Sequence, residues 1–311
     1  MVDVLIVGSI AYDSIETPLG ISEDELGGSA TYAGFASAFH NKRLDGAGIS
    51  MVGVVGQDFL PRHISWFVEA GLEISGVETA EGQTFRWKGS YHGDMSEAQT
   101  HETHLNVFEN FKPVVPKHAL SPKVLFCANL HPALQASVLD QTSPTRLTLL
   151  DSMNLWIDIA LDGLLEVLKR ADIVVLNDGE VRLLAGDQNL VRAGHTLQEM
   201  MEGGILVVKR GEHGALALHP HGLLSLPAFP IAEVTDPTGC GDTFAGALAA
   251  HLSQGEGKVG LKELEGALIH ATVTASFTLE TFGCDRIRNL SPAEYESRLT
   301  DFQQISNSNG F

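Results

Sequence analysis

Short, continuous apolar runs alternate along the chain with longer stretches in which apolar residues recur every three or four positions. The runs are rich in Val, Ile and Leu, and they predict strands at 4–8, 49–56, 124–129, 147–151, 172–177 and 205–209. Stretches with helical spacing follow most of them, at 132–141, 156–169, 179–186 and 194–202. Apolar strands separated by helices are typical of a largely parallel sheet with helices on both faces. We therefore expect an α/β fold, in a single domain over 1–311.

Two segments interrupt this alternation. Residues 12–26 are polar and rich in turn-forming residues, and residues 83–110 begin with a period of two, in which Phe85 and Trp87 alternate with basic residues. Together they predict a small antiparallel flap beside the main sheet, which would suit a lid over a ligand. Two ordinary surface insertions would give a similar pattern.

The chain is strongly acidic, with 39 Asp and Glu residues against 20 Lys and Arg and a formal net charge of −19. Such a surface repels phosphate backbones and anionic membranes, so we expect no nucleic acid and no membrane partner. Cys127, Cys240 and Cys284 are far apart and form no C-x-x-C pair, which fits a reducing compartment. The N-terminus lacks the basic region of a signal peptide, and no apolar run approaches 18 residues. These features predict a cytoplasmic protein.

The stretch "EVTDPTGCGDTFAGALAAHL", residues 233–252, combines few charges with many small residues. We expect 231–234 to end a strand and 242–252 to form a helix with one apolar stripe. Between them, Gly239 and Gly241 would let the backbone turn sharply and approach a ligand closely.

The backbone N–H groups of residues 239–242 would point out of the start of this helix, where they and the helix dipole favour an anion. The charge of Asp242 opposes a phosphate there, unless its carboxylate takes a proton from a hydroxyl that attacks a phosphoryl group. A plain turn followed by an acidic first-turn residue explains the same letters equally well.

Two further strand-to-helix junctions carry polar or small residues. In "VVLNDGEVRLL", Asn177 and Glu180 could hold the waters around Mg²⁺ on a nucleotide, or form a capping box that closes the helix start. In "ELGGSATYAGFASAF", Gly27 and Gly28 would let a ligand hydroxyl meet the backbone, although close helix packing also favours small residues. Asp13 could accept two hydroxyls or cap a turn.

Two motifs do not support the function that their letters suggest. "GEGKVG" at 255–260 matches G-x-G-x-x-G but follows a helix, so it predicts a helix–helix loop and not a dinucleotide site. "HETH" at 101–104 places its histidines three apart, whereas the zinc motif needs four, and a solvated flap is the better interpretation.

The order of these elements resembles the ribokinase-like carbohydrate kinases of the PfkB family. "GSIAYDSI" followed by "LGGSATYAG" is similar to the family's N-terminal signature, and "DIVVLNDGE" to its N-x-x-E element. "DPTGCGDTFAGAL" resembles the C-terminal signature, with Pro237 and Cys240 as variants, and "VGVVGQDF" and "GLEISGV" resemble two intermediate landmarks. The resemblance covers nearly the whole chain. It implies a three-layer sandwich with a central, mostly parallel sheet and a small β lid.

The resemblance also implies a reaction, the transfer of the γ-phosphoryl group of ATP to an alcohol with Mg²⁺. By position, Asp242 would be the catalytic base, and the anion hole would comprise Gly239, Cys240 and Gly241. Asn177 and Glu180 would organise Mg²⁺ and phosphate.

Other positions on the nucleotide side are matched less closely. Gly211 would lie along the nucleotide, and Lys209 stands where many relatives have Thr, so it could supply a cation to the phosphates. Asp236 and Thr238 match positions that bind K⁺ in some relatives, and the nucleobase would lie near His270 and the segment up to Gly283.

On the acceptor side, Asp13, Gly27 and Gly28 match residues that grip sugar hydroxyls, whereas Tyr32 replaces an Asn typical of ribose-specific members. Two further candidates come from the residues themselves. Phe85 and Trp87 offer an aromatic flap face that could cover a sugar ring or stack on a base. Asp151 and Asn154 follow a strand end, and we take Asn154 as a further acceptor contact.

These expectations define the activity as an ATP-dependent kinase of a small alcohol, with a sugar somewhat ahead of a nucleoside. A catalytically silent ligand-binding protein on the same fold is the alternative of another class. Asp242 argues against it, because its charge would only weaken phosphate binding in a silent protein. An apolar lid face could also pair with the lid of a second copy in a homodimer.

Overall fold

The computed structural model describes residues 2–93, 95 and 98–306. Its centre is a nine-stranded sheet with the order β13-β12-β11-β10-β9-β8-β1-β4-β5. Neighbouring strands from β11 to β5 pair in parallel, whereas β12 is antiparallel to both β11 and β13. The strands are β1 (Val4–Val7), β4 (Ile49–Gly56), β5 (Leu72–Ala80), β8 (Val124–Cys127), β9 (Leu147–Asp151), β10 (Ile173–Asn177), β11 (Ile205–Lys209), β12 (Ala215–His219) and β13 (Gly222–Leu226).

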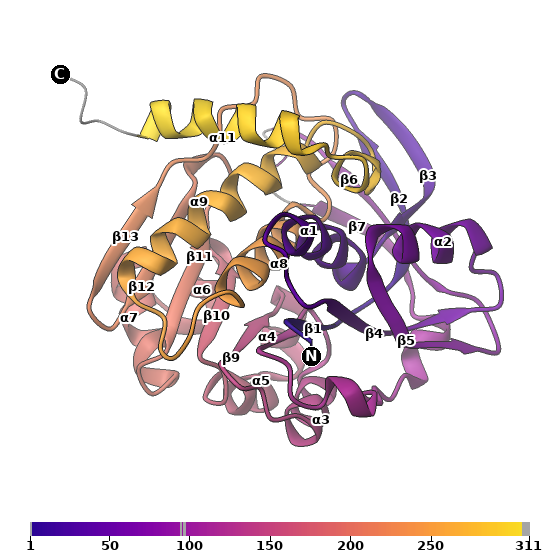
Figure 1. Cartoon of the computed structure of the whole chain (residues 1–311), viewed down its shortest axis with the longest axis horizontal. Helices are drawn as coiled ribbons and strands as arrows, with labels where there is room; N and C mark the ends of the chain where they lie inside the picture. Colours follow the sequence, from indigo (N-terminus) through magenta and orange to yellow (C-terminus); the bar gives the residue numbers. More distant parts are fainter. Residues whose placement is uncertain (1, 94, 96–97, 307–311) are drawn as a thin grey trace.

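Helices cover both faces of this sheet (Figure 1). One core contains residues of α1 (Ser29–Arg43), α2 (Pro61–Ala70), α8 (Cys240–Leu252), α9 (Leu261–Thr278), α10 (Asp285–Arg288) and α11 (Pro292–Ser306). The opposite face packs against α3 (Pro132–Gln141), α4 (Asn154–Ile159), α5 (Leu161–Leu168), α6 (Asp178–Ala185) and α7 (Leu190–Met200).

Each central strand supplies both cores. In β10, Ile173 and Val175 enter the core beneath α8 and α9, whereas Val174 and Leu176 enter the core beneath α5 to α7. Successive side chains of a strand point to opposite faces, so a strand covered on both sides must be apolar throughout. This requirement explains why the predicted strands carried no polar alternation, and it confirms the α/β sandwich.

Two local expectations were wrong. Residues 231–234 form no strand, and the backbone N–H of the next residue, Thr235, donates to the carbonyl of Leu279 at 2.8 Å and not to a neighbouring strand. The helix expected over 156–169 is divided into α4 and α5 at Ala160, whose φ of −143° leaves the helical region.

The two interrupting segments come together in a second, four-stranded sheet with the order β3-β2-β6-β7. Its strands are β2 (Ala11–Thr17), β3 (Gly20–Gly27), β6 (Phe85–Tyr91) and β7 (Ala98–His104). The central pair, β2 and β6, is parallel, so the flap is mixed and not wholly antiparallel as expected. The "HETH" residues, 101–104, lie on exposed β7.

Helices α1 and α8 pack closely and in parallel. A Cβ atom on Gly246 would lie 2.4 Å from the carbonyl oxygen of Ala33, and the hydroxyl of Ser37 donates to the carbonyl of Gly246 at 2.7 Å. Nearer the helix starts, the ring of Tyr32 lies against Gly239. Contacts therefore advance together along both helices, and the two N-termini lie at the same end.

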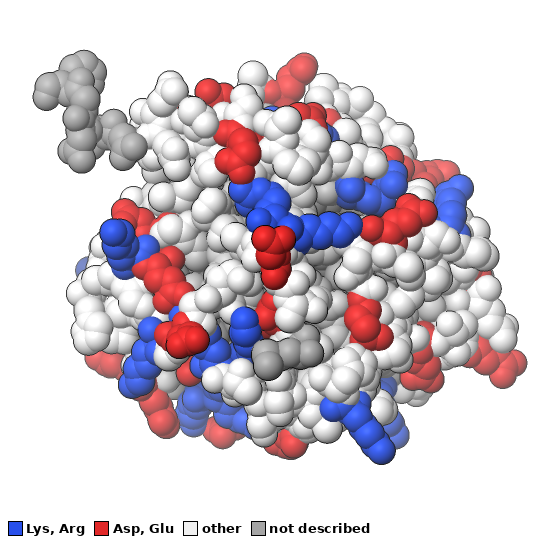
Figure 2. All heavy atoms as spheres, in the orientation of Figure 1, with Lys and Arg blue, Asp and Glu red and all other residues white. Residues whose placement is uncertain are grey.

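The surface mixes charges of both signs. On the face in Figure 2, lysine and arginine side chains lie beside acidic ones and do not gather into one basic patch. Among the described residues, no helix has both the length and the apolar content that crossing a bilayer requires.

The α1–α8 crossing predicts opposite effects for two helical glycines. Gly246→Ala should destabilise the protein by about 1–3 kcal/mol, because its methyl group would press on the backbone of Ala33. Gly266→Ala, in α9, should stabilise it by about 0.5–1 kcal/mol, because nothing lies within 4 Å of the added carbon and alanine favours a helix. Urea unfolding midpoints measure both. Equal shifts for the two variants would show that the crossing is not tightly packed.

Candidate active site

The polar residues expected at strand ends meet at one edge of the main sheet. Asp151, Asn177 and Lys209 are the last residues of β9, β10 and β11, which are parallel neighbours. The start of α8 adjoins them, because a Cβ atom on Gly241 would lie 3.0 Å from Nζ of Lys209. In open α/β sheets, ligands bind at this carboxyl edge.

The turn that starts α8, residues 239–242, has the geometry of an anion site and is called the anion turn. Gly239 caps the helix in the left-handed region, with φ 72°, and a Cβ atom there would lie 2.3 Å from the ring of Tyr32. The N–H of Cys240 donates to the carbonyl of Pro237 at 3.2 Å. The N–H groups of Gly241 and Asp242 follow in the first turn, where a helix offers no partner of its own. Together with the helix dipole they favour a negatively charged group.

Asp242 occupies this first turn and is half-buried. Burial and the nearby carboxylate of Asp151 raise its pKa to about 7, although the ammonium of Lys209 acts in the opposite direction. A carboxylate with a pKa near neutrality is a far stronger base than an ordinary aspartate. The environment therefore suits Asp242 to proton transfer.

Asn177 and Glu180 form the capping box that the sequence left as an alternative. The N–H of Asn177 donates to Oε2 of Glu180 at 2.7 Å, and the N–H of Glu180 donates to Oδ1 of Asn177 at 2.8 Å. Burial raises the pKa of Glu180 to about 7, with Lys209 opposing and Asp151 adding to the shift. Oε1 of Glu180 takes no part in the box. The capping role thus leaves one carboxylate oxygen for a ligand.

Lys209 is a buried cation among these acids. Its Nζ donates to Oδ2 of Asp151 at 2.9 Å, and the side chains are only 19% and 4% exposed. Burial lowers the pKa of Lys209, but the carboxylates of Asp151, Glu180 and Asp242 outweigh it and hold the pKa above its usual value. Lys209 therefore remains charged.

Asp13 lies on the lid strand β2 and is almost fully buried. A Cβ atom on Gly27 would lie 1.9 Å from its Oδ2, and one on Gly28, where φ is 94°, would lie 2.5 Å from the carbonyl oxygen of Ser9. Burial and the carboxylate of Asp236 raise the pKa of Asp13 to about 8; the N–H of Gly28 lowers it and Asp242 adds to the rise. Neither position has room for a side chain, because Asp13 lies against Gly27 and the backbone of Ser9 lies against Gly28.

Tyr32 is buried beneath the anion turn, with 1% of its surface exposed. Burial, together with Asp236 and Asp13, raises the pKa of its phenol far above the usual value. Its hydroxyl oxygen finds no hydrogen-bond partner among the described residues. A phenol therefore stands beside Gly239 where a polar amide was typical of the resembling family.

The lid carries three aromatic residues at alternate positions of β6, and the ring of Phe85 stacks on that of Phe108, at 5.4 Å between centroids. Phe85, Trp87 and Tyr91 alternate along β6, and Trp87 pairs in parallel register with Asp13, so their side chains share a face. The hydroxyl of Thr238 donates to the hydroxyl of Tyr91 at 3.2 Å, which ties the lid to the loop before α8. Sequence reasoning missed Tyr91, although the alternation that starts at Phe85 extends to it.

The remaining loop acid, Asp236, is 1% exposed. Its Oδ1 accepts the N–H of Thr238 at 2.8 Å and its Oδ2 accepts the N–H of Gly283 at 3.0 Å. The carboxylate thereby joins the anion turn to the segment after α9. In this arrangement its side-chain oxygens stabilise the loop.

Three further predicted site residues are exposed or make contacts outside this cluster. Asn154 is exposed at the start of α4, and Gly211 is exposed in a turn after β11 with open space around it. The ring of His270 stacks on that of His251, at 3.8 Å between centroids, and His251 in turn hydrogen-bonds His40. His251 follows Asp242 by nine residues, about 14 Å along a helix. The contacts of these three residues with substrates remain predictions.

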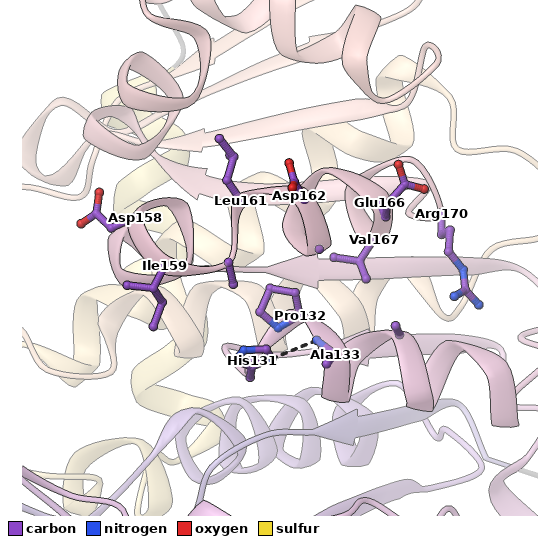
Figure 3. Close-up of a pocket in the computed structure, with 13 residues that line it drawn as sticks. His131, Pro132, Ala133, Asp158, Ile159, Leu161, Asp162, Glu166, Val167 and Arg170 are labelled. Atoms are coloured by element: carbon purple, nitrogen blue, oxygen red, sulfur yellow. Dashed lines mark hydrogen bonds between the residues drawn. The ribbon is translucent and has the colours of Figure 1, made fainter.

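A pocket of about 570 Å³ lies elsewhere, on the opposite face of the sheet from α8. It opens between α3 and α5, and Figure 3 shows His131 and Pro132 on one side of it and the acidic side chains of α5 on the other. It is lined by none of the predicted site residues.

Comparison with known proteins assigns the family. The family model described as pfkB family carbohydrate kinase matches residues 1–289. The chain belongs to the pfkB family of carbohydrate kinases. This kinase is therefore a phosphotransferase that acts on a hydroxyl group of its acceptor.

The kinase is 30% identical to a cytidine kinase of Thermococcus kodakarensis over 261 residues, which are 82% of this chain and 90% of the relative. Its fold is similar to a nucleoside kinase of Burkholderia thailandensis in complex with inosine, with a TM-score of 0.74 and 21% identity over 97% and 99% of the two chains. A ribokinase II of Escherichia coli in complex with ATP and Mg²⁺ also has a TM-score of 0.74, with 18% identity over 97% of this chain and 100% of that chain.

The environment of Asp242 predicts a pH dependence. A base works only when ionised, so kcat/KM of the kinase should rise with pH through about 7 and level off above it. Steady-state rates from pH 5 to 9 in one buffer series measure this limb. Asp162→Asn, an exposed first-turn acid of α5, should leave the limb in place. An acid limb near pH 4 would contradict the role of burial.

Proposed function

We propose that this kinase transfers the γ-phosphoryl group of ATP to a hydroxyl of a nucleoside, with Asp242 as the base. The observation that carries the proposal is the position of Asp242: a carboxylate with a pKa of about 7 in the first turn of a helix whose N–H groups favour an anion. An acid is unfavourable beside a bound phosphate unless it removes a proton.

The chemistry needs positioning more than covalent help. Asp242 accepts the proton of the acceptor hydroxyl as its oxygen forms a bond to the γ-phosphorus, and the bond from that phosphorus to the bridging oxygen breaks to release ADP. The N–H groups of Gly241 and Asp242, with Cys240 and Gly239 shaping the turn, meet the charge that develops on the phosphoryl oxygens. Lys209 adds a fixed positive charge beside Gly241.

The residues also fit a magnesium ion. Oε1 of Glu180 and the side chain of Asn177 would hold waters of Mg²⁺ at the carboxyl edge of the sheet. The ion, when bound, neutralises charge on the phosphates. ATP and Mg²⁺ are present together in the E. coli neighbour, which supports the same pair here.

A nucleoside is the acceptor that two observations favour. The relative that matches over 90% of its own length is a cytidine kinase. The lid places Phe85 and Trp87 on the same face as Asp13, so an aromatic surface for a base adjoins a carboxylate for ribose hydroxyls. The motifs alone had favoured a sugar, which is the competing outcome.

Further expectations belong to the same proposal. K⁺ near Asp236 and Thr238 would have to coexist with the hydrogen bonds that hold this loop. A homodimer through the lid is consistent with the exposed Leu19 and Ile21 at the β2–β3 turn and with the exposed edge strand β7. We expect the enzyme to act in the cytoplasm, on a small molecule and on neither nucleic acid nor membrane.

Asp242→Asn should lower kcat by a factor of about 10³ or more without weakening ATP binding, because the amide preserves shape and no longer repels the phosphates but cannot take the proton. ADP release is measured with Mg²⁺ over cytidine, uridine, inosine, adenosine, ribose and fructose, in KCl and again in NaCl. Asp162→Asn serves as the matched control.

Turnover with nucleosides supports the proposal, and equal rates in the two salts would remove K⁺ from it. Turnover confined to free sugars would replace the acceptor class. Wild-type rates in Asp242→Asn would remove the base.

A further inference from the structure

Among the described residues, Asp151 is the one carboxylate that pairs with Lys209, and the proposed transfer step gives it no role. Both its oxygens are engaged: Oδ2 accepts Nζ of Lys209 at 2.9 Å and Oδ1 accepts the N–H of Ser152 at 2.8 Å. The side chain of Gln135 also donates to its carbonyl, at 2.9 Å. These contacts fix the carboxylate at the end of β9.

Stability alone does not explain such a pair. Removing two charges from water is costly, and apolar residues of similar volume often serve a protein's stability as well or better. The Asp151 side chain is nevertheless almost wholly buried, at 4% exposed, and that of Lys209 is 19% exposed. Nζ of Lys209 also lies beside the turn that starts α8, 3.0 Å from where a Cβ atom on Gly241 would be. The absence of that side chain gives the ammonium access to the anion turn.

We propose that Asp151 is a positioning residue of the phosphoryl-transfer site: it fixes the Lys209 ammonium against the turn at Gly241, where Lys209 meets the transferred group, and the two charges together set the ionisation of Asp242. The inference rests on the proposed function of Asp242 and assigns its regulation to a pair of side chains on β9 and β11.

The charges that face Asp242 come from four elements. The titratable groups that interact electrostatically with Asp242 are Asp13 on β2, Asp151 on β9, Lys209 on β11 and the Cys240 thiol on α8, whose pKa burial raises to about 12. After burial, Asp151 raises and Lys209 lowers the pKa of Asp242. Removal of the Asp151 charge should therefore lower the pKa of the base, and a released Lys209 would lower it further.

The test compares Asp151→Asn, Lys209→Met and the double variant in the wild-type background. For Asp151→Asn, the acid limb of kcat/KM should move to lower pH by about one unit, as for a charge removed from contact distance. At pH 8, kcat/KM for ATP should fall about 10²-fold, because a misplaced cation no longer meets the phosphoryl group. At pH 8, the double variant should have a kcat/KM for ATP no lower than that of Lys209→Met alone, because Asp151 acts on the transferred group through Lys209.

The chain offers a matched control pair. Asp3, whose side chain is 1% exposed, is paired with Lys123 at 2.9 Å, and both residues immediately precede strands at the opposite, amino-terminal edge of the sheet. Asp3→Asn should lower the melting temperature, as Asp151→Asn should, because each substitution removes a buried carboxylate that pairs with a lysine; the lysine side chains are 33% exposed for Lys123 and 19% for Lys209. It should not move the pH limb or kcat/KM for ATP.

Asp151→Asn with a wild-type pH limb and wild-type kcat/KM for ATP would overturn the inference, whatever its melting temperature. The inference would also be overturned if the losses of kcat/KM for ATP in Asp151→Asn and Lys209→Met were additive in the double variant. Failure of the proposed function is distinct: it would appear as full activity in Asp242→Asn. An inactive Asp242→Asn beside an unaffected Asp151→Asn would reject the positioning role alone.

Discussion

The close parallel contact between α1 and α8 is the constraint on which the site depends. Because Gly246 admits the backbone of Ala33, the two helices run side by side with their N-termini at one end. The Gly27-Gly28 turn and the Gly239–Asp242 turn are thereby brought together, although more than 200 residues separate them in the chain. Two helix dipoles then point their positive ends at the same region, which favours anionic ligands in a protein whose overall charge is −19.

The acids gathered here are a cost to the folded state. Asp13, Glu180 and Asp242 have pKa values raised to between about 7 and 8, mainly by burial. A carboxyl group whose pKa is raised by folding favours the folded state when protonated, and this contribution is lost as pH rises from the unfolded value through the folded one. At neutral pH the cluster therefore weakens the fold, and ligands that carry positive charge would relieve it. Sites that store such strain are common where chemistry is performed.

Much of the fold followed from local pattern, because a strand buried on both faces must be apolar at every position. β4 and β9 were predicted with their observed ends for this reason. The method failed where tertiary context decides. The run at 231–234 is apolar enough for a strand, but the chain beside it hydrogen-bonds the end of α9, at Leu279, and not the sheet. β12 and β13 were not predicted; they form an antiparallel hairpin that extends the sheet from β11. β5 was recognised only as a family landmark.

For the site, motifs identified Asp242, the glycine turns and the strand-end residues, since each combines an unusual residue with an unusual place. Pairings were beyond their reach. Sequence could not show that Asp151 contacts Lys209, that Tyr32 is buried under Gly239, or that His270 stacks on His251, because each contact joins distant elements. Asn177 and Glu180 show another limit, because helix capping and ligand binding call for the same residue types at the same spacing.

The hydrogen bond between the hydroxyls of Thr238 and Tyr91 couples the lid to the loop that leads into α8. Asp13 lies on the same small sheet as Tyr91, so the carboxylate proposed to bind the acceptor is linked through paired strands to the residue that contacts Thr238. Binding of the acceptor, exclusion of water by the lid and positioning of the loop would then accompany one movement of the lid. A substrate that moves the lid would therefore move the loop before α8 with it, through two side chains that are already in contact.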